Sequence, residues 1–554
     1  MSLADDNKLK EIRRQEAEEL AKIMSEKYKI PYVDLSVVSI NTDALRLIPE
    51  KDAREADVAA FQLTGTKVHL LTISPEKAET RSAIESLVSR HYEPQLYLGT
   101  MTSLERAWDR YKEISYSMET RAGLIDVSGE RLEESMSHIN SLASLKKYVE
   151  EISASNSGHG VSMILELVLA GAIKMKASDI HMEPQEESVR LRYRLDGVLQ
   201  DIAYFGHPTY KLIASRIKLI SSLKLNIQKS AQDGRFTIGL KGKEMEVRTS
   251  VIPGAYGESI VMRLLDPESI NIELEQMGID PYLLGIFNKE ISKPNGMILI
   301  TGPTGSGKTT TLYAFLRKIS SPENKTITIE DPIEYHLKGV SQTQVNEEKG
   351  YTFLEGLRSA LRQDPDIIMV GEIRDKETAD IAIQSALTGH LVFSTLHTNN
   401  AAGAIPRLID LGVNPKIIGS ALNLTIAQRL SRRLCQYCKK EVEPKPEEKK
   451  IIDEVVVSVQ KKRKDIDLTG KSMVWISVGC EKCQGLGYKG RVGIFEAIVV
   501  GEEIGKLVDQ SSNEADIKKA AEYQGILDMK EDGIVKVLNG ITSIDELGRV
   551  VDLS

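Results

Sequence analysis

An apolar segment, a glycine-rich loop and a helical segment follow one another directly between residues 296 and 319, and this succession constrains the fold most. The loop fits the pattern G-x-x-x-x-G-K-[ST] from Gly302 to Thr309. Glycines let such a loop wrap an anion closely with its backbone N–H groups pointing inward, and the following helix adds the positive end of its dipole. The sequence therefore predicts a phosphate-binding loop between a strand and a helix of an α/β fold.

In a loop of this kind, the lysine contacts the β- and γ-phosphates of a nucleotide, and the next hydroxyl residue is a ligand of Mg²⁺. Lys308 and Thr309 occupy these two positions. A glycine-rich turn with an incidental lysine is the alternative, but such a turn does not require the flanking strand and helix. The residues expected to bind the nucleotide are Gly302, Thr304, Gly305, Ser306, Gly307, Lys308, Thr309 and Thr310.

Polar side chains end three further apolar segments that we expect to be strands. Glu330 and Asp331 end TITIED, Glu372 ends DIIMVGE, and His397 ends LVFSTLH. Because ligands bind outside the carboxyl ends of strands in an open parallel sheet, these side chains should share one edge with the phosphate loop. Hydrolysis needs a carboxylate that orients water or helps to hold the metal, and either glutamate could have either role. The imidazole of His397 could sense a γ-phosphate or bridge to a catalytic acid.

The four cysteines of the chain form two Cys-x-x-Cys pairs, Cys435 with Cys438 and Cys480 with Cys483. Each pair can bind one cation from a tight turn, and two pairs complete a tetrahedral site of four thiolates. Four protein ligands leave no open position, so a bound Zn²⁺ would be structural. Free buried cysteines or a redox pair are the alternatives, and the confinement of all cysteines to these two pairs favours zinc.

Changes in composition and periodicity indicate several domains in a chain of 554 residues. Apolar strands that alternate with helical stretches predict a parallel sheet with crossover helices, whereas short strands separated by glycine-rich turns indicate an α+β domain. The expected parts are an N-terminal α/β domain at 1–115, a polar linker at 116–158, an α+β domain at 159–272, a parallel α/β core at 273–430, a cysteine-bearing module at 431–495 and a helical region at 496–554.

The formal net charge is -8, and aromatic residues make up 5% of the chain. Proteins that coat nucleic acid or anionic membrane usually carry a basic excess, so this charge disfavours both classes. No apolar run approaches the roughly 20 residues that span a bilayer, and the charged N-terminus lacks the apolar stretch of a signal peptide. We therefore expect a cytoplasmic protein without a transmembrane segment, whose membrane association depends on partners.

Four segments resemble, in this order, the Walker A, Asp box, Walker B and His box of secretion ATPases: GPTGSGKTTTLYAFL, TIEDPIEY, LRSALRQDPDIIMVGEIRD and TGHLVFSTLHTN. From about residue 159 onward, the chain is most similar to the branch that powers type II secretion and type IV pilus extension, the GspE/PulE/PilB-like group. The resemblance implies a RecA-like ATPase core preceded by a PAS-like domain. It also implies a variable N-terminal domain, and the cysteine module is similar to the tetracysteine module of this branch.

The resemblance further implies an activity, partners and roles for single residues. ATP hydrolysis in a homo-hexamer would move two domains as rigid bodies, turn an inner-membrane platform protein and add pilin or pseudopilin subunits. Glu330 matches the Asp-box acid, Glu372 the Walker B glutamate and His397 the His-box histidine. Arg248 and Arg263 match arginines that reach the nucleotide from the preceding domain, although both could instead be strand residues in surface ion pairs.

Two functions of other classes remain open from the sequence alone. A RecA-like nucleic-acid motor would need a basic channel or stacking aromatic residues, and the acidic balance and few aromatic residues disfavour it. A nucleotide-dependent scaffold would bind ATP with little turnover, and the presence of both Glu330 and Glu372 disfavours it. We therefore expect an ATPase motor with no direct nucleic-acid partner.

Overall fold

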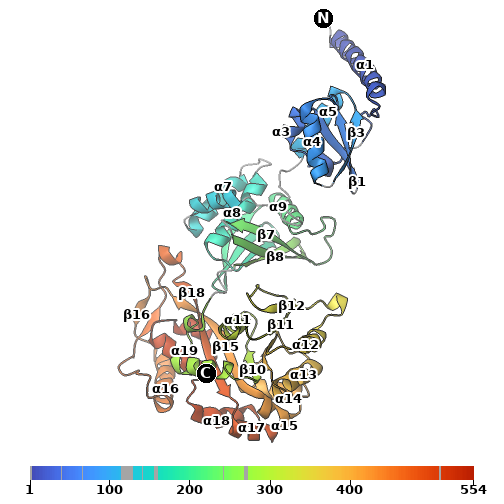
Figure 1. The fold of residues 1–554 in the computed structure, drawn as a ribbon. Coiled ribbons are helices and arrows are strands. Elements are labelled where there is room, and N and C mark those ends of the chain that lie inside the picture. The colour runs from blue at the N-terminus through green and yellow to red at the C-terminus, as the bar shows by residue number, and fades with distance from the viewer. Residues whose placement is uncertain are drawn as a thin grey trace. The chain divides into compact units, whose positions relative to one another are not determined.

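Figure 1 shows the fold of the computed structural model, which describes residues 3–38, 40–45, 47–64, 66–90, 92–113, 129–139, 141–154, 160–240, 243–266, 272–510 and 513–554. The chain forms two compact units, Met1–Met118 and Glu119–Ser554. Among the described residues, the first unit has one hydrophobic cluster and the second has three.

The N-terminal unit is built on a three-stranded sheet in the order β1-β2-β3, with the first pair antiparallel and the second parallel. Val68 and Leu70 of β2 are fully buried, as the alternation of the strand predicts. The indole N–H of Trp108 donates to the carbonyl of Val58 at 3.0 Å and so ties the last long helix to the first strand. The elements are α1 (Leu3–Tyr28), α2 (Thr42–Leu45), α3 (Glu50–Glu55), β1 (Val58–Thr64), β2 (Lys67–Thr72), α4 (Ala78–Ser89), β3 (Glu93–Leu98), α5 (Met101–Asp109) and η1 (Arg110–Glu113).

The second unit begins with helices packed on a six-stranded antiparallel sheet in the order β6-β5-β4-β9-β8-β7. Burial alternates along β5, so Tyr193 faces the helices while Arg192 and Arg194 lie on the opposite face. The Tyr193 hydroxyl donates to the carbonyl of Val168 on α8. The elements are α6 (Gly129–His138), α7 (Leu142–Ala154), α8 (Gly160–Lys174), β4 (Asp179–Pro184), β5 (Val189–Leu195), β6 (Val198–Phe205), α9 (His207–Ile220), β7 (Gln232–Leu240), β8 (Lys243–Gly254) and β9 (Gly257–Leu265).

Part of the expected linker at 116–158 is helical and packed. Helices α6 and α7 bury Leu132, Leu145 and Val149 in the same hydrophobic cluster as α8. The apolar residues of this segment are spaced for one helical face, and its polar residues cover the outside. The overall polar composition of this segment suggested a linker, although its few apolar residues are spaced as in amphipathic helices.

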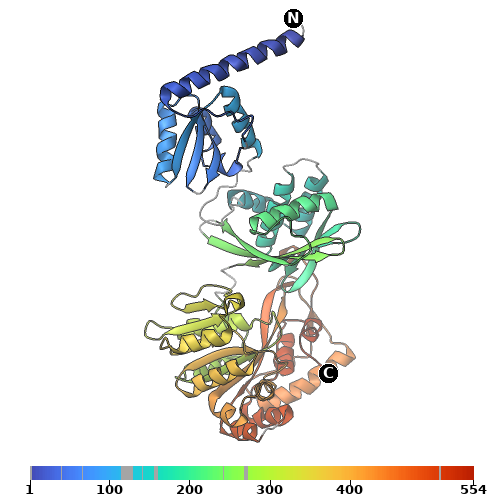
Figure 2. The same cartoon turned by 90° about the vertical axis from the view of Figure 1, so that its right-hand side faces the viewer.

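The central sheet has seven strands in the order β12-β11-β13-β14-β10-β15-β18, parallel except for the last pair. Helices lie on both of its faces (Figure 2). All six residues of β10 are buried, with Met297 and Leu299 in one hydrophobic cluster and Ile298 and Ile300 in the other. This explains why the strand before the phosphate loop is a continuous apolar run. The elements are η3 (Leu274–Gln276), α10 (Pro281–Ile291), β10 (Gly296–Thr301), α11 (Lys308–Ile319), β11 (Thr326–Glu330), β12 (Ser341–Gln344), η4 (Glu347–Lys349), α12 (Phe353–Leu361), β13 (Ile367–Val370), α13 (Lys376–Leu387), β14 (Leu391–Leu396), α14 (Ala404–Asp410), α15 (Pro415–Ala421), β15 (Leu422–Leu434) and β18 (Tyr488–Val499).

The cysteine module is an excursion between β15 and β18, both of which extend from the central sheet into the range 431–495. It contains a two-stranded antiparallel ribbon and one long helix, and the helices of the C-terminus follow β18. These elements are β16 (Lys440–Val442), α16 (Pro446–Lys462), β17 (Val474–Ile476), η5 (Glu481–Cys483), α17 (Glu502–Asp509), α18 (Glu514–Ala521), η6 (Glu522–Gln524), α19 (Met529–Leu538) and α20 (Ile544–Gly548).

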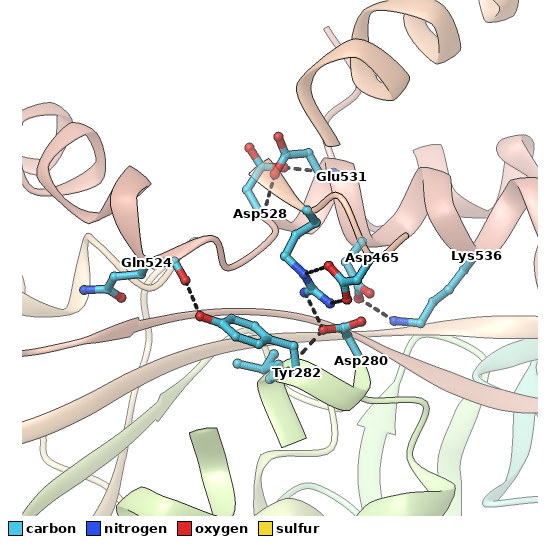
Figure 3. A network of polar contacts seen from close by, with 10 residues as sticks. Asp280, Tyr282, Asp465, Gln524, Asp528, Glu531 and Lys536 are labelled. Atoms are coloured by element: carbon cyan, nitrogen blue, oxygen red, sulfur yellow. Dashed lines mark hydrogen bonds and ion pairs between the residues drawn. The ribbon is translucent and has the colours of Figure 1, made fainter. Parts of the chain in front are cut away.

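A polar network joins this excursion to the first helix of the core (Figure 3). Arg463 follows α16, is 5% exposed, and donates to Asp280 at 2.8 Å and to Asp465 at 2.7 Å. Its guanidinium lies 4.5 Å from the centre of the Tyr282 ring, and the Tyr282 hydroxyl donates to the carbonyl of Gln524. Asp280 is the N-cap of α10. The network therefore links the module, the start of the core and the C-terminal helices.

Candidate nucleotide-binding and hydrolysis site

The phosphate loop, residues 302–307, leaves the carboxyl end of β10 and enters α11 at Lys308. Gly302 has a φ of 146°, and a Cβ there would lie 2.5 Å from the carbonyl oxygen of Gln428 on β15. Gly307 caps α11 with a left-handed φ of 89°. Glycine is required at both positions, at the first by close packing and at the second by conformation.

The Lys308 ammonium lies over the loop, where it donates to the carbonyls of Gly302 at 2.8 Å and Pro303 at 3.2 Å. Burial lowers the pKa of Lys308, although the nearby Glu372 carboxylate acts in the opposite direction. A half-buried cation held by neutral carbonyls is suited to bind an anion that enters the loop.

One cavity of about 740 Å³ brings most of the expected residues together. Its lining contains the loop from Thr304 onward, the strand-end residues Glu330, Glu372 and His397, and Arg263 from the six-stranded sheet. Arg248 instead lines a neighbouring cavity of about 600 Å³, which also contains Arg263. The predicted nucleotide residues in the first cavity are Thr304, Gly305, Ser306, Gly307, Lys308, Thr309 and Thr310, whereas Gly302 lies beneath the loop against β15.

Glu372 follows β13 and has two polar neighbours, Arg374 and His397. Arg374 donates a hydrogen bond to its Oε1, and the Nε2 atom of His397 lies 3.4 Å from its Oε2. The hydrogen bond to Glu372 is the main reason why the pKa of Arg374 is raised. The Glu372 side chain is still 20% exposed, so this carboxylate can contact a water molecule or ligand in the cavity.

Glu330 ends β11 in a different environment, with only 3% of the residue exposed. It accepts hydrogen bonds from the Tyr313 hydroxyl, from Thr328 Oγ1 at 2.5 Å and from Gln342 Nε2 at 3.0 Å. Burial raises the pKa of Tyr313, and the charge of Glu330 raises it further, so the phenol remains a donor at neutral pH. Three neutral donors hydrogen-bond to the Glu330 carboxylate, whereas the Glu372 carboxylate remains partly exposed.

Replacing Tyr313 by phenylalanine is expected to lower the free energy of unfolding by about 1–3 kcal/mol, because the buried Glu330 carboxylate loses a donor. Equilibrium urea unfolding of the full chain measures this change. Tyr351→Phe is the matched control, since the Tyr351 hydroxyl bonds the neutral Thr343 Oγ1 at 3.0 Å and its loss should cost less. Equal stability of Tyr313→Phe and the parent protein would contradict the prediction.

The two candidate arginine fingers already have partners. Arg248 donates to the carbonyl of Ile333 and lies 3.4 Å from the Glu334 carboxylate. The Nε atom of Arg263 lies 2.9 Å from Asp179, and its side chain is 57% exposed. Arg248 therefore contacts the segment after β11, while Arg263 lines the cavity with more than half of its side chain exposed.

The four cysteines converge, with all sulfur atoms within 4.8 Å of one another. The Sγ–Sγ separation is 3.9 Å for Cys435 and Cys480 and 3.8 Å for Cys438 and Cys483. Four sulfurs at about 2.3 Å from a tetrahedral zinc lie about 3.8 Å apart, so the set has the dimensions of a zinc site. Although burial acts in the opposite direction, the backbone N–H groups of Cys480 and Gly487 help to lower the pKa of the Cys483 thiol, which favours the thiolate that zinc requires.

The sequence profile of the family described as "Type II/IV secretion system protein" matches residues 154–549. The chain belongs to this family. A second profile, the MshEN domain, matches residues 28–121. Several members of the family to which this chain is similar are named as ATPases, so this chain is an ATP-hydrolysing secretion/pilus ATPase. The expected RecA-like fold class is confirmed.

Relatives of this secretion ATPase serve two kinds of machine. The type IV pilus assembly ATPase PilB of Myxococcus xanthus is 36% identical over 537 residues, which cover 96% of this chain and 91% of that protein. The type II secretion system protein E of Aeromonas hydrophila is 44% identical over 387 residues, or 70% of this chain and 75% of that protein. The ATPase DotB of Legionella pneumophila shares the fold, with a TM-score of 0.50 at 22% identity over 70% of this chain and 95% of that one.

The sequence pattern did not indicate all residues of the cavity in this ATPase. Arg194 and Arg491 also line it, as does Leu430 of β15. Alternation along β5 places Arg194 on the open face of its sheet, but no motif in that strand points to the phosphate loop. No local motif connects Arg491 with a loop almost two hundred positions earlier. Among the described residues, no helix combines the length and apolar character needed to cross a bilayer.

Proposed function

We propose that this ATPase works as a homo-hexameric motor that adds pilin or pseudopilin subunits in a type IV pilus or a type II secretion machine. The motor is cytoplasmic and acts on an inner-membrane platform protein, through which it associates with the membrane. Its cycle uses the domain division expected from the sequence, with 159–272 and 273–430 moving as rigid bodies.

The observation that carries this proposal is the composition of the 740 Å³ cavity. A phosphate loop, the strand-end residues Glu372 and His397, and an arginine from the preceding domain all border one space. ATP bound there would contact both domains of the unit, so loss of the γ-phosphate would change the contacts between them. The similarity to pilus assembly and type II secretion ATPases supports the choice of machine.

The main predicted site residues receive roles in this proposal. Lys308 binds the phosphates, Glu372 orients the attacking water, and Glu330 fixes the end of β11 and the P-loop helix through Tyr313. Arg263 and Arg248 neutralise charge on the transferring phosphoryl group. The Thr309 hydroxyl and the cavity carboxylates are oxygen donors that fit Mg²⁺, which would supply charge neutralisation between the phosphates. Cys435, Cys438, Cys480 and Cys483 hold a structural Zn²⁺.

Phosphate release from Mg-ATP by the purified full chain tests the activity, and native mass with a non-hydrolysable ATP analogue tests the ring. We expect turnover and a mass of six subunits, both lost in Lys308→Ala because the analogue no longer binds. ATP binding without turnover would favour a nucleotide-dependent scaffold. Turnover that single-stranded DNA stimulates would favour a nucleic-acid motor, and a monomer with bound analogue would refute the ring.

A further inference from the structure

The loop after His397, residues 398–401, is attached to three strands of the central sheet, and we call it the His397 loop. Its first residue is held by the last residue of β10. The backbone N–H of Thr398 donates to Thr301 Oγ1 at 2.8 Å, and the two threonine hydroxyls lie 2.6 Å apart. Because Thr301 directly precedes the phosphate loop, the two loops share one anchor.

Arg429 on β15 makes the second attachment. Its Nη2 donates to the carbonyl of Asn399 at 2.7 Å, while its Nη1 donates to the carbonyl of Gln428 at 3.0 Å. The same Nη1 would lie 3.1 Å from a Cβ at position 302, so the guanidinium packs against Gly302. Its charge also helps to lower the pKa of Lys308. Arg429 thus bridges the His397 loop and the phosphate loop.

Glu496 on β18 makes the third attachment. Its Oε1 accepts from the backbone N–H of Ala401 at 2.6 Å, and its Oε2 accepts from the backbone N–H of Met529 at 3.2 Å. Met529 is the first residue of α19, whose N-terminus also carries the Asp528–Glu531 capping box (Figure 3). Both oxygens of Glu496 therefore have backbone donors, one from the His397 loop and one from the C-terminal helices.

The sheet register places these two side chains together. Glu496 pairs with Ala427 and Ile494 pairs with Arg429 across β15 and β18. Because residues two apart on a strand share a face, Arg429 and Glu496 project from the same face of the sheet. The electrostatic interaction between them raises the pKa of Arg429, against the larger lowering effect of burial. The pair thus holds the Asn399 carbonyl and the Ala401 N–H of one short loop.

We propose that Arg429 and Glu496 are positioning residues that fix the His397 loop and thereby hold the His397 imidazole beside Glu372. This inference rests on the proposed function, in which Glu372 orients water. It goes further by assigning a task to two residues outside the phosphate and metal motifs. Geometry in such a site is demanding, since a displacement of about 1 Å can cost about 100-fold in rate. The contact with Met529 also connects the His397 loop to α19.

Glu496→Gln tests the proposal without changing side-chain size. Each carboxylate oxygen faces an N–H donor, so the amide places its own NH₂ group against one of them. We expect kcat for ATP hydrolysis to fall about tenfold, with KM changed by less than about twofold because the phosphate loop is intact. Arg429→Lys keeps the charge but replaces the planar two-nitrogen fork, whose separate nitrogens reach Asn399 and Gln428, by a single nitrogen. We therefore expect the same fall in kcat with little change in KM. Glu290→Gln, at a glutamate that is 2% exposed and remote from the loop, is the control and should leave both parameters unchanged.

A second measurement separates positioning from general stability. If Glu496 acts through His397, Glu496→Gln should lower kcat by less than about twofold in a His397→Ala background. A full tenfold loss in that background, or unchanged kcat in both Glu496→Gln and Arg429→Lys, would overturn the proposal. If Glu496→Gln does not fold, the same test uses Arg429→Lys. Its effect on kcat is then compared between the unmodified protein and the His397→Ala background. Wild-type turnover in Glu372→Gln would instead refute the role of Glu372 in orienting water, and absence of ATP turnover in the unmodified protein would refute the proposed function itself.

Discussion

Glu372→Gln is expected to lower the rate of ATP hydrolysis by about 10²–10⁴-fold, the usual contribution of a positioned acid–base group. The substitution keeps the size of the side chain but removes its charge and its ability to accept a proton from water. It also removes the carboxylate that pairs with Arg374 and lies 3.4 Å from the Nε2 atom of His397. Nucleotide binding should persist, because Lys308 and the phosphate loop do not depend on the Glu372 side chain for their shape.

The measurement is phosphate release at saturating Mg-ATP, together with calorimetric titration of a non-hydrolysable ATP analogue. Glu330→Gln is the comparison that divides the roles of the two acids. Because three neutral donors occupy Glu330 inside the protein, we expect its amide to reduce turnover less than Glu372→Gln does. A larger loss in Glu330→Gln would assign the orientation of water to Glu330 and reverse the proposal.

The parts of the site that could be predicted from the sequence are those in which neighbouring residues determine the geometry. The loop from Gly302 to Thr309 needs only the strand before it and the helix after it. The prediction that Glu372 and His397 lie near this loop required one further rule, that parallel strands end at a common edge of the sheet. In the structure, β13 is next to β14, and β14 is next to β10. The family resemblance and the fold class are confirmed, whereas the roles of single residues remain predictions.

The rest depends on register and packing between distant segments. Arg429 and Glu496 meet the His397 loop only because β15 and β18 pair with Ala427 opposite Glu496. The environment of Glu330 depends on Tyr313 of α11 and Gln342 of β12, neither of which adjoins it in sequence. Contacts of this kind produce no periodic pattern within a single segment. The sequence could therefore predict that these residues lie on strands or helices, but not which residues they contact.

Removal of zinc or of one thiolate is expected to unfold the cysteine module. In Cys438→Ser, we expect zinc content to fall from about one ion per chain to nearly none, and stability to fall by more than about 4 kcal/mol. The reason is that metal affinity and folding of such a module are coupled, since no preformed site exists in the unfolded chain. Elemental analysis measures the metal, and thermal unfolding with and without a strong chelator measures the stability.

Tyr437→Ala is the matched control for Cys438→Ser, because this side chain is 69% exposed between the two ligands of the first pair. It should keep its zinc and its melting temperature. In Cys438→Ser, the unfolding should also extend beyond the module. The reason is that α16 lies between the cysteine pairs and is followed by Arg463, which ion-pairs with Asp280 at the start of the core. If reduced wild-type protein contains no zinc, or if chelation leaves the melting temperature unchanged, the four cysteines are free thiols and the Arg463 network alone anchors the module.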